Sequence, residues 1–200
     1  MKRLFILLII LVLLLGVFVA FAFLFLNFHI ARSLTNSRYN SSTASAGERI
    51  PASMQDSPVL SIAVLGDKCF SRALPSALQE QLQNDPMIST VKLLDTAADK
   101  AAGPYLLVDP NDLNILWMPV YARANLQIQA AFASDGDVSF RGKQPVELNL
   151  QAGPVIKFEG DIRIQDVSWG LISRPAYCDL LAKDTAEEIQ RALDPLFQAK

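Results

Sequence analysis

The sequence predicts an α+β protein with an N-terminal single transmembrane helix, a flexible tether, and one β-α-β-β-β-β-α domain whose mainly antiparallel sheet carries helices on one face. Three observations predict this class. First, the chain opens with a long apolar run. Second, a polar tract is followed by a strand rich in β-branched residues and by an amphipathic helix. Third, segments in which apolar and polar residues alternate precede a last helical stretch. We therefore divide the chain into an anchor at residues 1–30, a linker at residues 31–57 and a globular domain at residues 58–200.

The anchor consists of 23 consecutive residues, 4–26, without a charged or polar side chain. At roughly 1.5 Å per residue, a helix of this length spans about 34 Å, enough to cross a hydrocarbon core of about 30 Å. A cleaved signal peptide is the alternative, because Lys2 and Arg3 form a basic start. The apolar region of a signal peptide is usually only about 7–15 residues long. We therefore predict an uncleaved anchor, with residues 4–28 in the lipid bilayer.

The charges that flank this run indicate its orientation. Lys2, Arg3 and the terminal amine precede it, and Arg32 and Arg38 follow it. The excess of positive charge close to the first end favours a cytoplasmic N-terminus. The C-terminal domain would then be extracytoplasmic, in the periplasm or the extracellular space. Because so short a tail can also be translocated, the opposite orientation stays open.

Residues 31–57 are rich in Ser, Thr, Asn and Ala and have almost no large apolar side chain, which predicts a flexible tether. The domain then begins with a strand at residues 59–65. Leu74, Leu78 and Leu82 share one face of the amphipathic helix that follows, with Ser71 as its expected N-cap. Residues 87–95 resume strand character and complete a β-α-β opening.

Consecutive strands fill the middle of the domain. Between residues 121 and 130, Tyr, Arg, Asn and Gln occupy the odd positions while Ala, Leu and Ile occupy the even ones. This alternation predicts a strand with one buried and one solvated face. Asp135-Gly136 is a hairpin signal, and further strands are predicted at residues 137–140 and 144–151. Residues 154–169 alternate again, with Gly160 as the expected site of a bulge.

Two cysteines lie near the starts of the two domain helices. Cys69 precedes the first, and Cys178 lies in the opening turns of the last, for which Ser173 is the expected N-cap. If both helices start at the same end of the sheet, the thiols could form a disulfide. Such a bridge would close a loop of about 110 residues and contribute on the order of 4–5 kcal/mol. Two buried, unpaired cysteines are the alternative, and a cytosolic domain would keep them reduced.

The residues that usually carry catalysis are scarce. The one histidine, His29, lies at the end of the apolar run, so the domain offers no Ser-His or Cys-His pair. The carboxylates at residues 109–112 and 135–137 resemble fragments of calcium loops, but turn chemistry explains them. We predict no enzyme, no cofactor and no metal; an enzyme that uses a carboxylate or Cys178 is the alternative. The net charge of −2, without a basic patch, argues against a nucleic-acid partner.

Trp117, Met118 and Tyr121 form the candidate partner surface. They belong to a strand that Pro119 interrupts and that carries large side chains at both odd and even positions, and so on both faces. Trp and Met are enriched at interfaces, so one interpretation is a surface that binds a partner. The alternative is a strand covered by a helix on one face and by a loop on the other. Trp169, just before the last helix, is expected to close the end of the domain.

The order of elements resembles the small α+β domain of bacterial envelope accessory lipoproteins, of the lipopolysaccharide-assembly and ABC-transport auxiliary types. The shared features are the strand at residues 60–65, the long strand and hairpin at residues 122–140, and the closing helix at residues 180–193. Those proteins hang from a lipidated cysteine, whereas this chain has a spanning helix. We predict a non-catalytic, membrane-anchored accessory domain that binds a protein or lipid-like partner in the envelope. A membrane-anchored enzyme of unknown reaction and a purely structural envelope spacer are the alternatives.

Overall fold

Three helices and six strands make up the described part of the chain, which comprises residues 2–45, 59–66, 68–85, 88–95, 103–136 and 156–198 of a computed structural model. In chain order, the elements are α1 (Lys2–Phe25), β1 (His29–Ser45), β2 (Val59–Val64), α3 (Cys69–Gln83), β3 (Thr90–Leu93), β4 (Tyr105–Met118), β5 (Tyr121–Ala133), β6 (Ile156–Ile172) and α4 (Arg174–Gln198).

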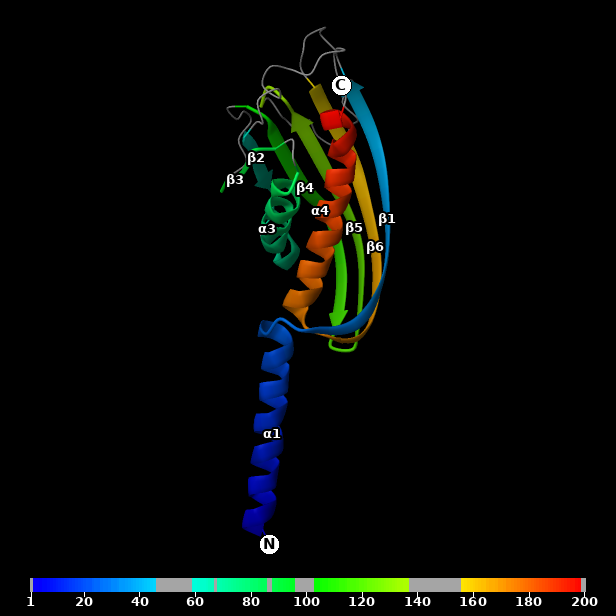
Figure 1. Ribbon diagram of the computed structural model, residues 1–200. Coiled ribbons are helices and arrows are strands. Elements are labelled where there is room, and N and C mark those ends of the chain that lie inside the picture. The colour runs from blue at the N-terminus through cyan, green and yellow to red at the C-terminus, as the bar shows by residue number, and fades with distance from the viewer. Residues whose placement is uncertain are drawn as a thin grey trace.

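The strands form one sheet in the order β1-β6-β5-β4-β2-β3. β2 runs parallel to β3 and β4, whereas the pairs β4–β5, β5–β6 and β6–β1 are antiparallel. Figure 1 shows α3 and α4 on one face of the curled sheet, with α1 projecting away from it. From β2 onward the order is β-α-β-β-β-β-α. The α+β class, the mainly antiparallel sheet and the one-sided helix packing are therefore confirmed.

β1 differs from the flexible tether that the composition predicted. Residues 29–45 form an edge strand that pairs with β6 along its full length. Its side chains explain this, because Ser33, Thr35 and Ser37 make hydrogen bonds to partners on β6 and α4. A polar strand is thus ordered by hydrogen bonds, where an apolar strand would be ordered by burial. The rest of the expected tether, residues 46–57, lies outside the described residues.

The main core lies between the two domain helices and the sheet. The residues at even positions from 122 to 130 of β5 are all buried in it, which confirms the alternation that the sequence predicted. Leu74, Leu78 and Leu82 of α3 meet them together with Leu181 and Ile189 of α4. The odd positions of β5 lie on the opposite face of the sheet, where Ala131 and Ala133 pack in a second, smaller core and the odd positions from 121 to 129 are half-buried or exposed.

The two domain helices begin differently from each other. α3 begins at Cys69, with Lys68 at the N-cap position and no side-chain cap, so the prediction of Ser71 as the cap was wrong. Ser71 lies inside the helix and is buried. The prediction for α4 is confirmed, since the helix begins one residue after Ser173 and the backbone N–H of Ala176 donates to the Ser173 hydroxyl at 3.4 Å.

The irregularity in the sheet lies in β4. Gly160 pairs with both neighbouring strands without a shift in register, so the bulge predicted there was wrong. The register shifts instead between Asp109 and Asp112, where Pro110 lacks a backbone N–H for the ladder. The segment that we interpreted as a turn is therefore a bulge within a long strand. Residues 137–140 and 144–151, where further strands were predicted, lie outside the described residues.

Candidate functional site

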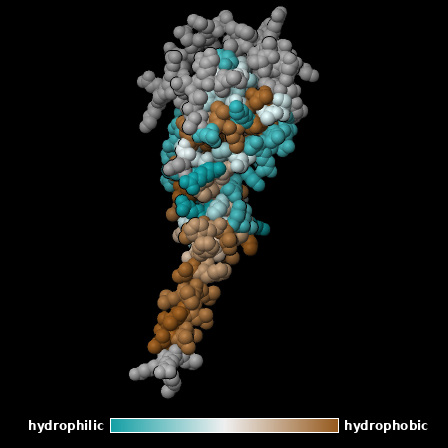
Figure 2. Space-filling view, turned by 90° about the vertical axis from the view of Figure 1, so that its left-hand side faces the viewer, coloured by the Kyte–Doolittle hydropathy of each residue, from teal (hydrophilic) through white to brown (hydrophobic). Residues whose placement is uncertain are grey.

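α1 is long and apolar enough to cross a membrane. Residues Ile6–Phe25 have a mean hydropathy of 3.4, and the domain buries none of that span. Figure 2 shows α1 as a hydrophobic column that ends where a surface rich in hydrophilic residues begins. The predicted anchor is thus a continuous helix with the length and composition of a membrane span.

A short hydrogen-bonded junction joins α1 to the domain. The backbone N–H of Ser173 donates to the carbonyl oxygen of Phe28 at 3.0 Å, and the N–H of Phe28 donates to the Ser173 hydroxyl at 3.0 Å. Beside them, the Asn27 side-chain amide donates to the Asp179 carboxylate at 2.6 Å. The ring of Phe28 also packs edge-on against Phe23 in the last turns of α1, with centroids 4.9 Å apart. The start of α4 therefore fixes the chain where it leaves α1.

A disulfide joins Cys69 to Cys178, as the helix starts predicted. The two Cα atoms lie 5.9 Å apart, so the bond ties the first residue of α3 to the second turn of α4. Because Ser173 at the start of α4 also holds the junction, the beginnings of both domain helices lie next to the end of α1.

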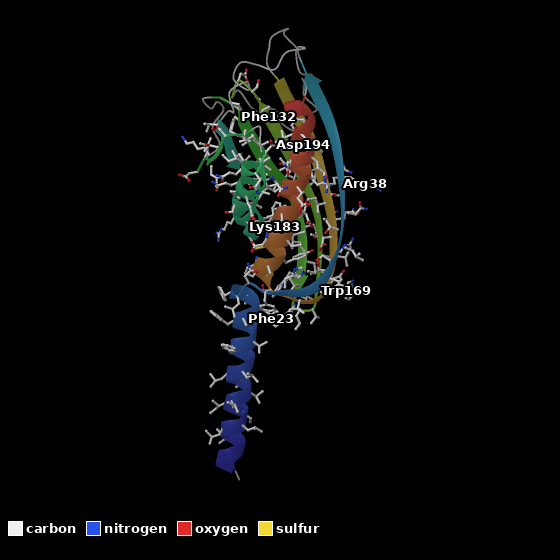
Figure 3. The ribbon with its side chains drawn as sticks, viewed as in Figure 1. Phe23, Arg38, Phe132, Trp169, Lys183 and Asp194 are labelled. Carbon is white, nitrogen blue, oxygen red and sulfur yellow. A yellow bond between two sulfur atoms is a disulfide. The ribbon has the colours of Figure 1, made fainter. Side chains whose placement is uncertain are left out.

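The sheet presents an apolar surface at the same end of the domain. We call it the α1-proximal patch, and it comprises Ile30, Leu116, Met118, Val120, Trp169 and Leu171, each at least 44% exposed. Register places Ile30 opposite Leu171 and Trp169 opposite Tyr121, on the face away from α3 and α4. Figure 3 shows Trp169 at the end of the sheet near Phe23, with Phe132 at the far end.

The three candidate partner residues have different environments. Trp117 points inward, packs against the main core, and its indole N–H donates to the carbonyl oxygen of Ile172 at 3.1 Å. Met118 is exposed, and Tyr121 is half-buried with its ring 4.5 Å from that of Trp169. Trp169 is 61% exposed, so the prediction that it closes the end of the domain was wrong. Its odd position in β6, opposite Tyr121, is the signal that could have placed it on the outer face.

A buried polar network holds β1, β6 and α4 together. Asp166 is fully buried, and its carboxylate accepts hydrogen bonds from the hydroxyls of Tyr177 at 2.8 Å, Ser168 at 2.9 Å and Thr35 at 3.0 Å. Burial raises the pKa of Tyr177 far above its usual value, and the hydrogen bond to Asp166 adds to the rise. Tyr177 therefore stays a neutral donor throughout the physiological pH range.

Thr35 extends this network to Asp184. Its hydroxyl oxygen lies 3.0 Å from the Asp166 carboxylate and 2.9 Å from that of Asp184, yet one hydroxyl has a single proton to donate. Burial raises the pKa of Asp184, and the hydrogen bond from Thr35 opposes the rise. When Asp184 is protonated, it donates to Thr35, which donates to Asp166, and both contacts are satisfied.

These groups fit structural roles in the observed state. Asp166 and Ser168 expose none of their surface, so a substrate has no access to them, and the sulfur of Cys178 is bonded rather than free. Among the described residues, no group of three or more His, Cys, Asp or Glu side chains could hold a metal ion.

Comparisons with known proteins give a likeness in structure and no family. No protein-family model matches the chain, and no curated protein matches it. Among solved structures, the chain is similar to a dodecamer of a PelC point variant from Paraburkholderia phytofirmans, at 7% sequence identity and a TM-score of 0.37. That similarity covers 78% of this chain and 98% of the PelC chain.

Proposed function

We propose that this protein is a non-catalytic accessory domain, anchored in the membrane by α1, whose α1-proximal patch binds a lipid-like partner. The observation that carries the proposal is the hydrogen-bonded junction at Phe28 and Ser173, because it holds the patch beside the end of α1. In the proposed orientation the N-terminus is cytoplasmic and the domain extracytoplasmic. A disulfide supports this orientation, since such bonds persist in oxidising compartments.

The position of the patch favours lipid over protein as the partner. The turn between β4 and β5 lies level with the last turn of α1 in Figure 1, where a bilayer around α1 would end. Trp and Tyr concentrate at this depth of membranes because their rings are amphipathic. Fully burying an apolar side chain of this size is worth roughly 1.5–3 kcal/mol, so even partial insertion of the patch would hold the domain against the bilayer.

Fluorescence quenching by lipid tests the proposal. The full-length Trp117→Phe variant, which keeps Trp169, is reconstituted into liposomes that contain lipids with brominated acyl chains. We expect strong quenching of Trp169 in these liposomes. The Trp169→Phe variant is the matched control, because the partly buried Trp117 should be quenched much less. If aqueous iodide quenches Trp169 and brominated lipid does not, the lipid proposal is wrong. Cross-linking of residue 169 to a protein would then identify a protein as the partner.

Thiol mapping in intact membranes tests the orientation. A membrane-impermeant maleimide, added with an impermeant reductant to sealed cells, should label Cys69 and Cys178. It should label neither of them without the reductant. Labelling only after the cells are lysed would place the domain in the cytoplasm and overturn the proposed topology.

A further inference from the structure

A pocket of about 390 Å³ lies where α1, α3 and α4 meet. Its lining comprises Leu24, Lys68, Cys69, Arg72, Arg174 and Pro175. The three charged members come from the starts of two helices, more than 100 residues apart in sequence, and all three are cationic. The protein as a whole has a net charge of −2, so this cluster of positive charge is a local feature.

The charge of the pocket is not neutralised by the part of the protein that the structure describes. Lys68, Arg72 and Arg174 are exposed, and the salt bridges among the described residues involve none of them. α3 and α4 both begin at the pocket, and neither has an acidic residue in its first turn. The N-terminus of a helix carries a partial positive charge that favours anions. The pocket therefore suits an anionic ligand with several acceptor oxygens.

The arrangement is held in place before any ligand binds. The disulfide fixes the start of α3, with Lys68 and Arg72, against α4. Arg174 follows Ser173, which is hydrogen-bonded to Phe28 at the junction. The backbone that carries these cations is thus fixed before binding, and arginine can donate two parallel hydrogen bonds to a phosphate.

The position of Leu24 indicates that the anion belongs to a membrane lipid. This residue belongs to the last turns of α1, so the pocket opens at the end of the proposed membrane span. A phosphate that arrives there on a lipid also has acyl chains that can lie along the apolar surface of α1. We propose that this pocket binds the phosphate of an anionic membrane lipid through Lys68, Arg72 and Arg174. The inference rests on the proposed function in that α1 must span the membrane.

Lipid binding to the full-length protein in neutral detergent micelles tests the inference. Native mass spectrometry during a titration with phosphatidylglycerol should show tight binding of one lipid, whereas phosphatidylcholine should bind much more weakly. A juxtamembrane cation contributes about a five-fold increase in affinity for anionic lipid. The triple variant K68Q/R72Q/R174Q should therefore bind phosphatidylglycerol roughly 100-fold more weakly. The single variant R72Q should lose about five-fold.

The matched control is R38Q/R123Q/R163Q, which removes three exposed charges from the outer face of the sheet. We expect it to retain the affinity of the wild type within about two-fold, and an equal loss in both triple variants would overturn the inference. Inorganic phosphate is added as a competitor. If it displaces phosphatidylglycerol at an equal molar concentration, the pocket is a site for free phosphate and the lipid source is wrong. Quenching of Trp169 by brominated lipid should persist in K68Q/R72Q/R174Q, so failure of the pocket and failure of the proposed function are distinguishable.

Discussion

Removal of the disulfide between Cys69 and Cys178 should destabilise the domain strongly. The bond spans a sequence separation of 109 residues. The loop-entropy relation gives a loss of about 16 cal/mol/K in the unfolded chain for a loop of this size, or about 4.8 kcal/mol at 25 °C. Small domains have free energies of unfolding of about 5–15 kcal/mol. We therefore expect the Cys69→Ala/Cys178→Ala variant to lose a third or more of its stability.

Guanidinium unfolding of the full-length protein in detergent micelles measures this loss. Fluorescence of Trp117 and Trp169 reports on the domain, because α1 contains no tryptophan. The oxidised wild type, the reduced wild type and the double alanine variant are compared. Reduction and substitution should lower the free energy of unfolding by the same amount within about 1 kcal/mol, since both open the same loop. A loss below about 1 kcal/mol in both would refute the loop-entropy reasoning for this bond.

Three further substitutions test the packing around β1 and α4. Tyr177→Phe removes a donor from the buried carboxylate of Asp166 and should cost about 1.5–3 kcal/mol in the same unfolding assay; no loss would contradict the network. Because burial raises the pKa of Asp184 in the folded state, wild-type stability should rise as the pH falls through that raised pKa, which lies above 3.8. The Asp184→Asn variant should lack this part of the rise. Parallel curves of unfolding free energy against pH for the two proteins would show that Asp184 is not the group responsible. Gly170 has φ +121°, and a Cβ there would lie 2.6 Å from a carbonyl oxygen of β1. Gly170→Ala should cost at least about 2 kcal/mol and speed hydrogen exchange in β1, whereas Gly16→Ala, with open space around it, should change neither.

The sequence predicted the elements whose hydrophobic period is strong. In β5, the alternation of Ala, Leu and Ile with longer polar residues determined both the strand and its buried face, because a pleated strand has no other way to bury that set. The pairing of Cys69 with Cys178 was predicted on the condition that both helices start at the same end of the sheet, and the structure meets that condition. In each case the local pattern and the fold imposed the same constraint.

Features that depend on contacts between distant segments could not be predicted in this way. β1 has no apolar period on its inner face, because Ser33, Thr35 and Ser37 meet hydroxyl and carboxylate partners that lie more than 130 residues away in sequence. Hydrophobic periodicity does not detect such a strand, and composition alone indicates disorder. The cationic pocket was hidden for a similar reason, since it exists only where the fold brings the two helix starts together.

The position of β1 changes where a partner must be. A tether of 27 residues, 31–57, could have carried the domain up to roughly 90 Å from the end of α1. In the structure, three residues separate the end of α1 from the start of β1, which allows a reach of only about 10 Å. The hydrogen bonds at Phe28 and Ser173 remove most of the remaining freedom. A domain held in this way cannot extend toward a distant partner. In the proposed function, where α1 spans a membrane, any partner must approach the membrane surface or lie within the membrane, next to the α1-proximal patch and the cationic pocket.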